Sequence, residues 1–110
     1  MRGMAIGLLL AGLGCGTVHA EWQSQTTTVG HLLRMCAGEG EDFCIGFLTG
    51  MVAGHALAKF KPYCPPKEGA TFTQYQEIFV AWAKRHPERW HEFNVVGVVE
   101  SLREAFPCGR

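Results

Sequence analysis

Five cysteines in a chain of 110 residues constrain the fold more than any other feature of this sequence. Each cysteine must be paired, bound to metal or kept as a free thiol, and an odd count leaves at least one over. Cys36, Cys44, Cys64 and Cys108 lie in the body of the chain, whereas Cys15 lies in an apolar N-terminal stretch. The role of that stretch therefore decides whether the other four can pair.

Residues 1–20 have the layout of a secretory signal peptide. Arg2 precedes an apolar run, and small residues lead to a cleavage position between Ala20 and Glu21. A buried helix of the domain and a lipoprotein signal, with Cys15 as the lipidated residue, are the alternatives. Cleavage after Ala20 would remove Cys15, so the exported chain would keep four cysteines and be expected to form disulfides.

Composition limits the class of protein. Ten basic and ten acidic residues give a net charge of zero, and loss of Arg2 with the signal makes it −1. This balance argues against nucleic acid or an anionic membrane as the main partner. With 47% apolar and 18% charged residues, the chain is too apolar to be disordered and long enough for one domain.

The pattern predicts an all-α domain over residues 28–110, preceded by a loose lead-in at 21–27. Thr28 is a candidate N-cap for a first helix that ends near Cys36, and residues 37–42 read as a loop. Residues 43–60 form the clearest helix, and its uncharged interior predicts a core helix buried nearly all round. That interior is too short to span a bilayer.

Gly46, Gly50 and Gly54 leave one face of this helix without side chains. Another helix can approach closely there, either from the same domain or from a second copy in a homodimer.

A Pro-rich connection at 61–71 leads to two further helices. Thr73 and Gln76 suggest a capping box, and the apolar positions that follow at helical spacing end near His86. Pro87 is expected to open the last helix at its first position. Helical spacing over residues 94–106 favours a helix, although residues 94–99 also suit a strand. Its expected inward stripe is Val95, Val99, Leu102 and Phe106.

Helix order predicts the disulfides. In an up-down-up-down, four-helix bundle-like fold, Cys36 and Cys44 share one end, and Cys64 and Cys108 share the other. Cys44 and Cys64 are separated by a helix of about 27 Å, far beyond the Cα separation of about 7 Å that a disulfide tolerates. The expected pairs are therefore Cys36–Cys44 and Cys64–Cys108.

Residues that could carry chemistry are few. The cysteine intervals do not match the close pairs of structural zinc sites, and paired thiols cannot be nucleophiles. His55 is expected to be a satisfied core or interface group, and Trp90 either packs in the core or anchors a partner. No phosphate loop or nucleophile elbow is present. The expectation is a protein that is not an enzyme and needs neither cofactor nor metal.

The cysteine framework and its flanking residues resemble the Rap/Tai immunity-protein family. The likeness covers residues 28–108 and runs through 32–36, 44–50, 63–66, 73–76, 86–88 and 106–108. The aromatic position after Cys44-x-Gly46, usually Tyr, is Phe47 here. The resemblance implies a small helical periplasmic protein that binds and blocks a type VI secreted peptidoglycan amidase.

Two exposed polar segments are the candidate contacts with such a partner: Lys67, Glu68 and Gly69, and Arg85, His86, Arg89, Trp90 and His91. The alternative function is a periplasmic helical stress protein or chaperone without a toxin partner.

Overall fold

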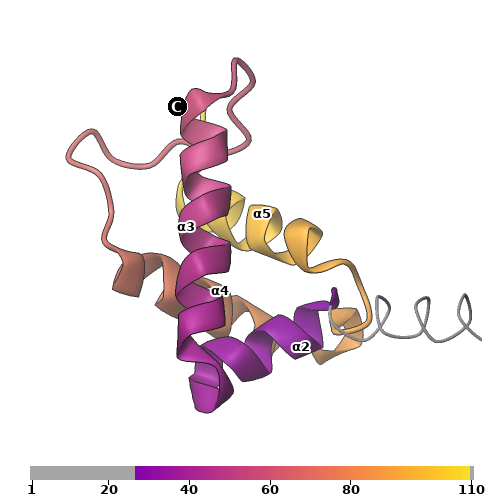
Figure 1. Ribbon diagram of the computed structural model, residues 1–110. Coiled ribbons are helices and arrows are strands. Elements are labelled where there is room, and N and C mark those ends of the chain that lie inside the picture. The colour runs from indigo at the N-terminus through magenta and orange to yellow at the C-terminus, as the bar shows by residue number, and fades with distance from the viewer. Residues whose placement is uncertain (1–26, 110) are drawn as a thin grey trace, which may run out of the picture.

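The computed structural model describes residues 27–109 of the chain (Figure 1). The predicted signal peptide with its expected cleavage position at Ala20–Glu21, Cys15 and nearly all of the predicted lead-in lie outside the described residues. The elements are α2 (Val29–Arg34), the π-helical segment η2 (Met35–Glu39), α3 (Glu41–Leu57), α4 (Phe72–Arg85), the 3-10 turn η3 (Pro87–Arg89) and α5 (Asn94–Ala105). Between residues 27 and 109 the extended structure is limited to one antiparallel bridge, Thr28–Phe93.

Helices α2, α4 and α5 pack against one another and hold most of the core. Fully buried side chains from all three meet there, including Val29 and Leu32, Phe79, and Val98 and Leu102. Gly97 permits the closest approach, because a Cβ at this position would lie 2.6 Å from Cγ2 of Val29. The three helices form a platform for the rest of the domain.

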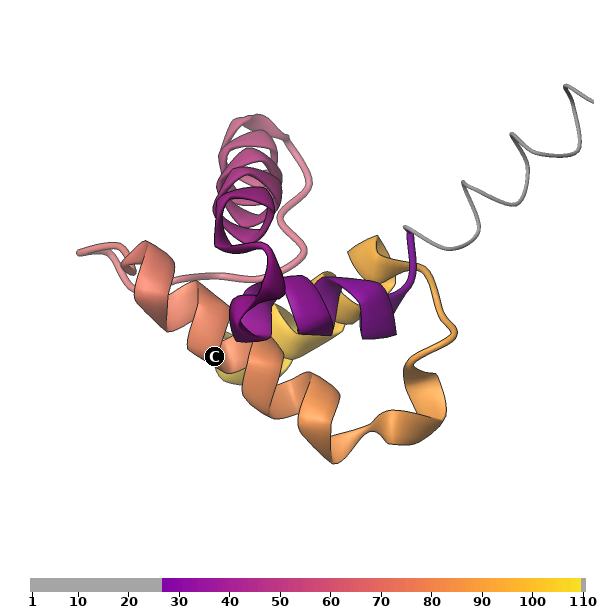
Figure 2. The same ribbon diagram turned by 60° about the horizontal axis from the view of Figure 1, so that its bottom comes forward.

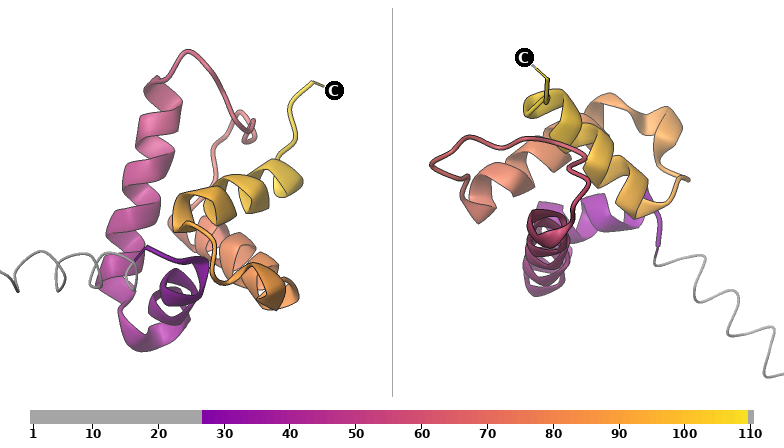
Figure 3. Two further views of the ribbon diagram at one scale, coloured as in Figure 1. Left: turned by 90° about the vertical axis from the view of Figure 1, so that its right-hand side faces the viewer. Right: turned by 90° about the horizontal axis from the view of Figure 1, so that it is seen from above.

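Helix α3 stands at the edge of this platform and contacts η2 and α4. Figure 2 shows its lower end joined to α2, and Figure 3 shows its upper half standing clear of α5 on one side. Its axis runs steeply across the platform helices instead of alongside them. Only Cys44 and Leu48 of its 17 residues are buried.

The predicted fold class is confirmed: within residues 27–109, four α-helices form a small bundle-like domain tied by two disulfides. The pairs are Cys36–Cys44, with Cα atoms 5.0 Å apart, and Cys64–Cys108, with Cα atoms 5.1 Å apart. Cys36 follows the first helix and Cys44 opens α3, while Cys64 and Cys108 follow α3 and α5. Each bond therefore joins two ends that the order of the helices brings together.

The prediction of a core helix buried nearly all round is wrong for α3. Phe43 is 46% exposed and Leu57 is 88% exposed, and a Cβ at Gly46, Gly50 or Gly54 would meet nothing within 4 Å. No other helix of residues 27–109 covers the glycine face. An uncharged helix can be buried at little cost. Its sequence does not show, however, whether another part of the same chain packs over it.

The junction between α2 and α3 is tighter than the predicted loop at 37–42. The chain passes from α2 into the π-helical turn and breaks at Gly38, whose φ of 129° favours glycine. Helix α3 then begins at Glu41, with Glu41 and Asp42 in its first turn. It ends at Leu57, three residues earlier than predicted.

The capping box of α4 lies two residues before its predicted position. Thr71 accepts from the backbone N–H of Gln74, whose side-chain oxygen accepts from the backbone N–H of Thr71. The alternative pair, Thr73 and Gln76, has the same spacing. Gln76 instead donates to the carbonyl oxygen of Cys36 at 2.7 Å, so a contact 40 residues away along the chain takes up its amide.

The last helix also departs from its prediction. Pro87 opens the short turn η3, and α5 starts only at Asn94. Its buried face comprises Asn94, Gly97, Val98, Ser101 and Leu102. Of the predicted stripe, Leu102 is buried, Val99 and Phe106 are half-buried, and Val95 is exposed. The core-facing stripe is thus displaced by about one residue from the predicted one.

Candidate functional site

A groove lies between α3 and the connection that returns from it to α4. Two adjoining hollows of about 430 and 320 Å³ share Val52, Ala56 and Tyr75 in their walls. Leu48 and Ala53 extend the groove along α3, and Pro65, Pro66 and Phe72 form part of the opposite wall. The lining is mainly apolar, which suits an apolar side chain or loop of a protein partner.

A hydrogen-bonded pair closes one end of the groove. His55 Nδ1 lies 2.7 Å from the hydroxyl oxygen of Tyr63, and the two rings meet edge to face with centroids 5.1 Å apart. Tyr63 is almost fully buried, whereas His55 is half-buried. The predicted satisfied role of His55 is therefore correct, and its partner comes from the connection.

The groove carries little ionisable chemistry at neutral pH. Burial raises the pKa of Tyr63 to about 12, with a further contribution from Tyr75, and burial also raises the pKa of Tyr75. Burial lowers the pKa of His55. Both hydroxyls and the imidazole are therefore neutral near pH 7, and Lys61 is the charged residue in the lining.

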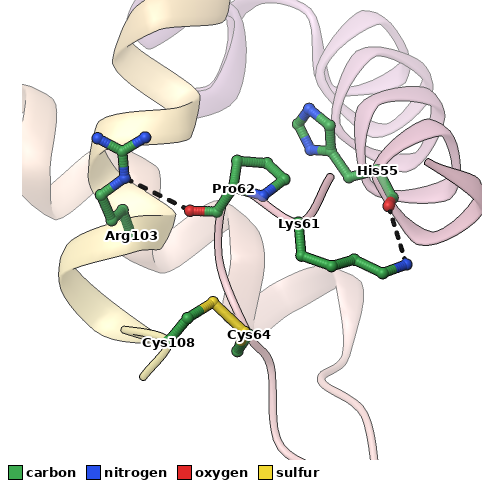
Figure 4. Close-up of a disulfide and its surroundings, with 6 residues drawn as sticks. All are labelled: His55, Lys61, Pro62, Cys64, Arg103 and Cys108. Atoms are coloured by element: carbon green, nitrogen blue, oxygen red, sulfur yellow. Dashed lines mark hydrogen bonds between the residues drawn. A yellow bond between two sulfur atoms is a disulfide. The ribbon is translucent and has the colours of Figure 1, made fainter. Parts of the chain in front are cut away.

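The connection is held at several points. Cys64 is bonded to Cys108, and the backbone N–H of Cys64 donates to the carbonyl oxygen of Phe106 at 2.8 Å. Figure 4 shows Arg103 of α5 approaching the carbonyl oxygen of Pro62 and Lys61 reaching back to the last turn of α3. The Lys61 ammonium lies 2.7 Å from the carbonyl oxygen of Ala56, so it caps that helix end. The wall of the groove is thus preorganised.

The first predicted contact segment adjoins this groove. Lys67, Glu68 and Gly69 are exposed and form a turn in which the N–H of Gly69 donates to the carbonyl oxygen of Pro66 at 2.8 Å. Gly69 has a φ of 84°, which favours glycine, and it also lines the larger hollow. A partner that enters the groove would meet this turn.

Most charged residues of the second predicted contact segment form hydrogen bonds and ion pairs within the chain. The Arg89 guanidinium binds both carboxylate oxygens of Glu92, reaches Glu100 at 3.2 Å and lies over the Trp82 ring. These hydrogen bonds raise the pKa of Arg89 and lower that of Glu92. Arg89 is therefore a structural contact between the turn after α4 and helix α5.

Several neighbours of Arg89 also form contacts within the chain. Arg85 pairs with Glu104 at 2.7 Å, and His86 pairs with Glu88 at 3.0 Å. The Trp90 indole donates to the carbonyl oxygen of Ala83 at 2.8 Å, but its side chain remains 41% exposed. His91 is exposed. Trp90 therefore packs on the surface of the domain without being buried in its core, and its predicted role as a partner anchor stays a prediction.

The two predicted segments do not come together. They lie at opposite ends of α4, whose 14 residues span about 21 Å. The groove itself was not predicted, because it depends on the return of the chain that brings Tyr63 onto His55. No spacing pattern marks such a contact.

Neither a metal site nor a membrane span is found among residues 27–109. No group of three or more His, Cys, Asp or Glu side chains is placed to hold a metal ion. No helix in this range combines the length and hydropathy that crossing a membrane requires.

The comparisons with known proteins give one match. A family model described as Rap1a immunity proteins matches residues 28–108, a range that includes both disulfides and the whole groove. No curated protein and no solved structure matches the chain.

Proposed function

The chain belongs to the Rap1a immunity protein family, and from this membership we propose that it is a periplasmic inhibitor of a type VI secreted peptidoglycan amidase. The family suggests an immunity protein that binds a secreted effector, and hence an inhibitor, not an enzyme. The match across the entire folded domain is the observation that carries the proposal. We propose in addition that the target is an amidase and that the protein acts in the periplasm.

The disulfides support an exported protein. Such bonds form and persist in oxidising compartments, and both pairs tie together segments that the fold depends on. An inhibitor of a cell-wall hydrolase must also reach the compartment where its target acts. Fractionation of the native host, with N-terminal sequencing of the mature protein, tests the predicted export and the cleavage before Glu21.

The groove, extended by the turn at Lys67–Gly69, is the surface that best suits inhibition. A rigid apolar wall backed by a disulfide can receive an apolar loop at a low cost in conformational entropy. The charged groups of the Arg85–Glu92 segment are largely paired within the chain, so we place that segment second. Trp90 and His91 are exposed members of that segment.

The experiment combines protection with binding. An amidase encoded by a gene next to the gene of this protein is directed to the periplasm of a test strain. Lysis of the cells is then measured with and without co-expression of the protein. Ala56→Trp, which fills the groove from α3, should abolish protection and capture of the amidase. Ala81→Trp, also at an exposed alanine but on α4, should leave both intact. Lysis that continues with the unmodified protein, without complex formation, would refute the proposed target.

A periplasmic stress protein or chaperone is the second candidate, and the exposed apolar side chains of α3 favour it. This function requires the protein to bind unfolded clients and to keep them soluble at acidic pH. A light-scattering assay with an acid-denatured client separates the two candidates. Suppression of client aggregation without any effect on an amidase would favour the chaperone.

A further inference from the structure

The two disulfides differ in their access to solvent. Cys36 and Cys44 are 4% and 0% exposed and belong to the core, whereas Cys64 and Cys108 are both exposed. A disulfide is exchanged when a thiolate attacks one of its sulfurs, so the rate depends on access. A reductant in solution can therefore reach Cys64–Cys108 in the folded protein, while the buried pair requires the core to open first.

Cys64 begins an exposed segment that forms one wall of the groove. Residues 64–69, which we call the wall segment, are all exposed. The residues that flank it are more enclosed, since Tyr63 is buried and Ala70 is half-buried against the core. Four members of the wall segment line the larger hollow of the groove: Cys64, Pro65, Pro66 and Gly69. One redox-accessible residue is thus part of the surface proposed to receive the effector.

The wall segment has few attachments to the rest of the domain. Figure 4 shows the disulfide that joins Cys64 to Cys108, and the backbone N–H of Cys64 donates to the carbonyl oxygen of Phe106 at 2.8 Å. The hydrogen bond from Gly69 to Pro66 stays within the segment. Among residues 27–109, one disulfide and one hydrogen bond, both at Cys64, therefore hold the wall segment between its two chain ends.

Two prolines couple Cys64 to the rest of the wall. Proline has a fixed φ and no N–H to donate, and it restricts the residue before it to extended conformations. Cys64 and Pro65 each precede a proline, so residues 64–66 form a stiff piece. A displacement of Cys64 therefore moves Pro65 and Pro66 with it, and the groove loses its fixed wall.

The helices have attachments of their own. The core comprises residues of α2, α3 and α4 with Tyr63, Val98 and Leu102, and it contains neither Cys64 nor Cys108. Helix α3 is bonded to the segment after α2 through Cys36–Cys44. Tyr63 stays buried and hydrogen-bonded to His55 at 2.7 Å, just before the wall segment begins. Opening of the exposed disulfide should therefore loosen the wall and leave the helices in place.

We propose that Cys64–Cys108 is a thiol–disulfide exchange site, at which reduction by a dithiol loosens the wall of the groove and weakens its hold on the effector. The last step rests on the proposed function, because it takes the groove as the effector-binding surface. The closed bond belongs to an oxidising compartment, where the inhibitor would act. In a reducing compartment the same chain would have an open bond and a weakened grip on its target.

The exchange proceeds in two steps. A thiolate of the dithiol attacks one sulfur of the pair, forms a mixed disulfide with it and releases the other cysteine as a thiolate. The second thiolate of the dithiol then attacks the mixed disulfide and releases the remaining cysteine. Two electrons and two protons pass to the protein, which gains two thiols, while the dithiol becomes a disulfide. An oxidant that accepts the same two electrons closes the bond again.

Graded reduction with dithiothreitol, followed by alkylation and mass spectrometry, tests the site. The first two thiols should map to Cys64 and Cys108, and the helical circular dichroism should be unchanged at that stage. Hydrogen exchange should accelerate at the N–H groups of Cys64 and Gly69 but not at that of Leu102 in the core. The dissociation constant for the amidase should rise about tenfold if the wall is in place about a tenth of the time.

A bridge of carbon is the matched control. Treating the two reduced thiols with 1,3-dibromoacetone joins Cys64 and Cys108 through thioether bonds, which a dithiol cannot open. The bridged protein should bind the amidase as the oxidised protein does, both with and without dithiothreitol. Reduced thioredoxin distinguishes the source of the reductant: opening of the pair by it indicates a protein dithiol, and opening by dithiothreitol alone indicates a small one.

Three results would overturn the proposal. The first is opening of Cys36–Cys44 before or together with Cys64–Cys108. The second is loss of the helical signal as Cys64–Cys108 opens, because the bond would then support the whole fold. The third is a reduced protein with unchanged amide exchange and unchanged affinity. If the oxidised protein captures no amidase, the proposed function fails, and amide exchange at Cys64 and Gly69 still decides whether the bond controls the wall.

Discussion

Gly97→Ala should destabilise the domain, although alanine is the better helix former. The added Cβ would lie 2.6 Å from Val29 Cγ2, 3.3 Å from Trp82 Cζ3 and 3.6 Å from Phe79 Cε2. All three neighbours are buried in the core. Val29 is β-branched and helical, so it has few other rotamers to adopt. The methyl group must therefore push α5 away from α2.

The magnitude follows from two opposing terms. Overpacking a filled core typically costs about 1–3 kcal/mol, and the close contact with Val29 places this site in the upper half of that range. Replacing a helical glycine by alanine stabilises the helix by about 1 kcal/mol, because alanine has the higher helix propensity. The net loss should be about 1–2 kcal/mol, which corresponds to a fall in Tm of about 4–16 °C for a domain of this size.

The control is a substitution at a helical glycine that has no neighbouring atoms to collide with. Gly54→Ala should stabilise the chain by about 0.4–1 kcal/mol, because nothing lies within 4 Å of its Cβ position. Denaturant melts of both variants, followed by circular dichroism, measure the two changes in the free energy of unfolding. The reasoning fails if Gly97→Ala is as stable as the unmodified protein, or if both substitutions have the same sign.

A double-mutant cycle identifies the colliding residue. Val29→Ala removes the Cγ2 atom that the new methyl group would meet, at the cost of a cavity. If the close contact is the cause, the double variant Val29→Ala/Gly97→Ala should be more stable than the sum of the single effects by about 0.5 kcal/mol or more. Strict additivity would place the strain elsewhere.

Three further predictions concern the groove, the turn after α4 and the disulfides. Tyr63→Phe removes the hydrogen bond to His55 and should cost about 0.5–1.5 kcal/mol in denaturant melts; no loss would show that the bond adds nothing to stability. Arg89 lowers the pKa of Glu92, so this carboxylate stabilises the fold above its unfolded pKa near 4.5 and loses that contribution as pH falls. Glu92→Gln should therefore show a smaller drop in Tm between pH 7 and pH 3 than the unmodified protein, and an equal drop would contradict this. Limited treatment with a dithiol should open Cys64–Cys108, whose residues are exposed, before the buried Cys36–Cys44 pair, as thiol labelling and mass spectrometry would detect.

The cysteine pairing could be predicted because it depends on order and length alone. Once Cys44 and Cys64 are assigned to opposite ends of one helix, a single pairing satisfies the reach of a disulfide. The same order places the ends of α2 and α3 together. These conclusions tolerate errors of two or three residues in the helix bounds, and such errors did occur.

The capping box shows where local sequence is insufficient. Thr71 with Gln74 and Thr73 with Gln76 are equivalent as patterns, and both could start a helix. In the structure Thr71 and Gln74 form the box, and Gln76 donates instead to the Cys36 carbonyl oxygen, a contact between distant parts of the chain that no local pattern reveals. The groove was unpredictable for the same reason, since His55 and Tyr63 meet only after the chain turns back.

The exposure of α3 illustrates a third limit. Its apolar composition was interpreted as burial, which is the usual outcome for an uncharged helix. Sequence cannot tell whether the covering surface comes from the same chain or from another molecule. The remaining helices, α2, α4 and α5, form a closed core that leaves the exposed side of α3 uncovered.

Helix α3 is joined covalently to the domain near both of its ends. Cys44 lies in its first turn, and Cys64 follows its last residue after a short turn that Lys61 also secures. Its conformation therefore depends on these attachments and on its inner face, and hardly on the outer side chains. Positions such as Gly50 and Leu57 can therefore change in identity at little cost to folding, so this side of α3 can diverge in sequence while the platform stays the same.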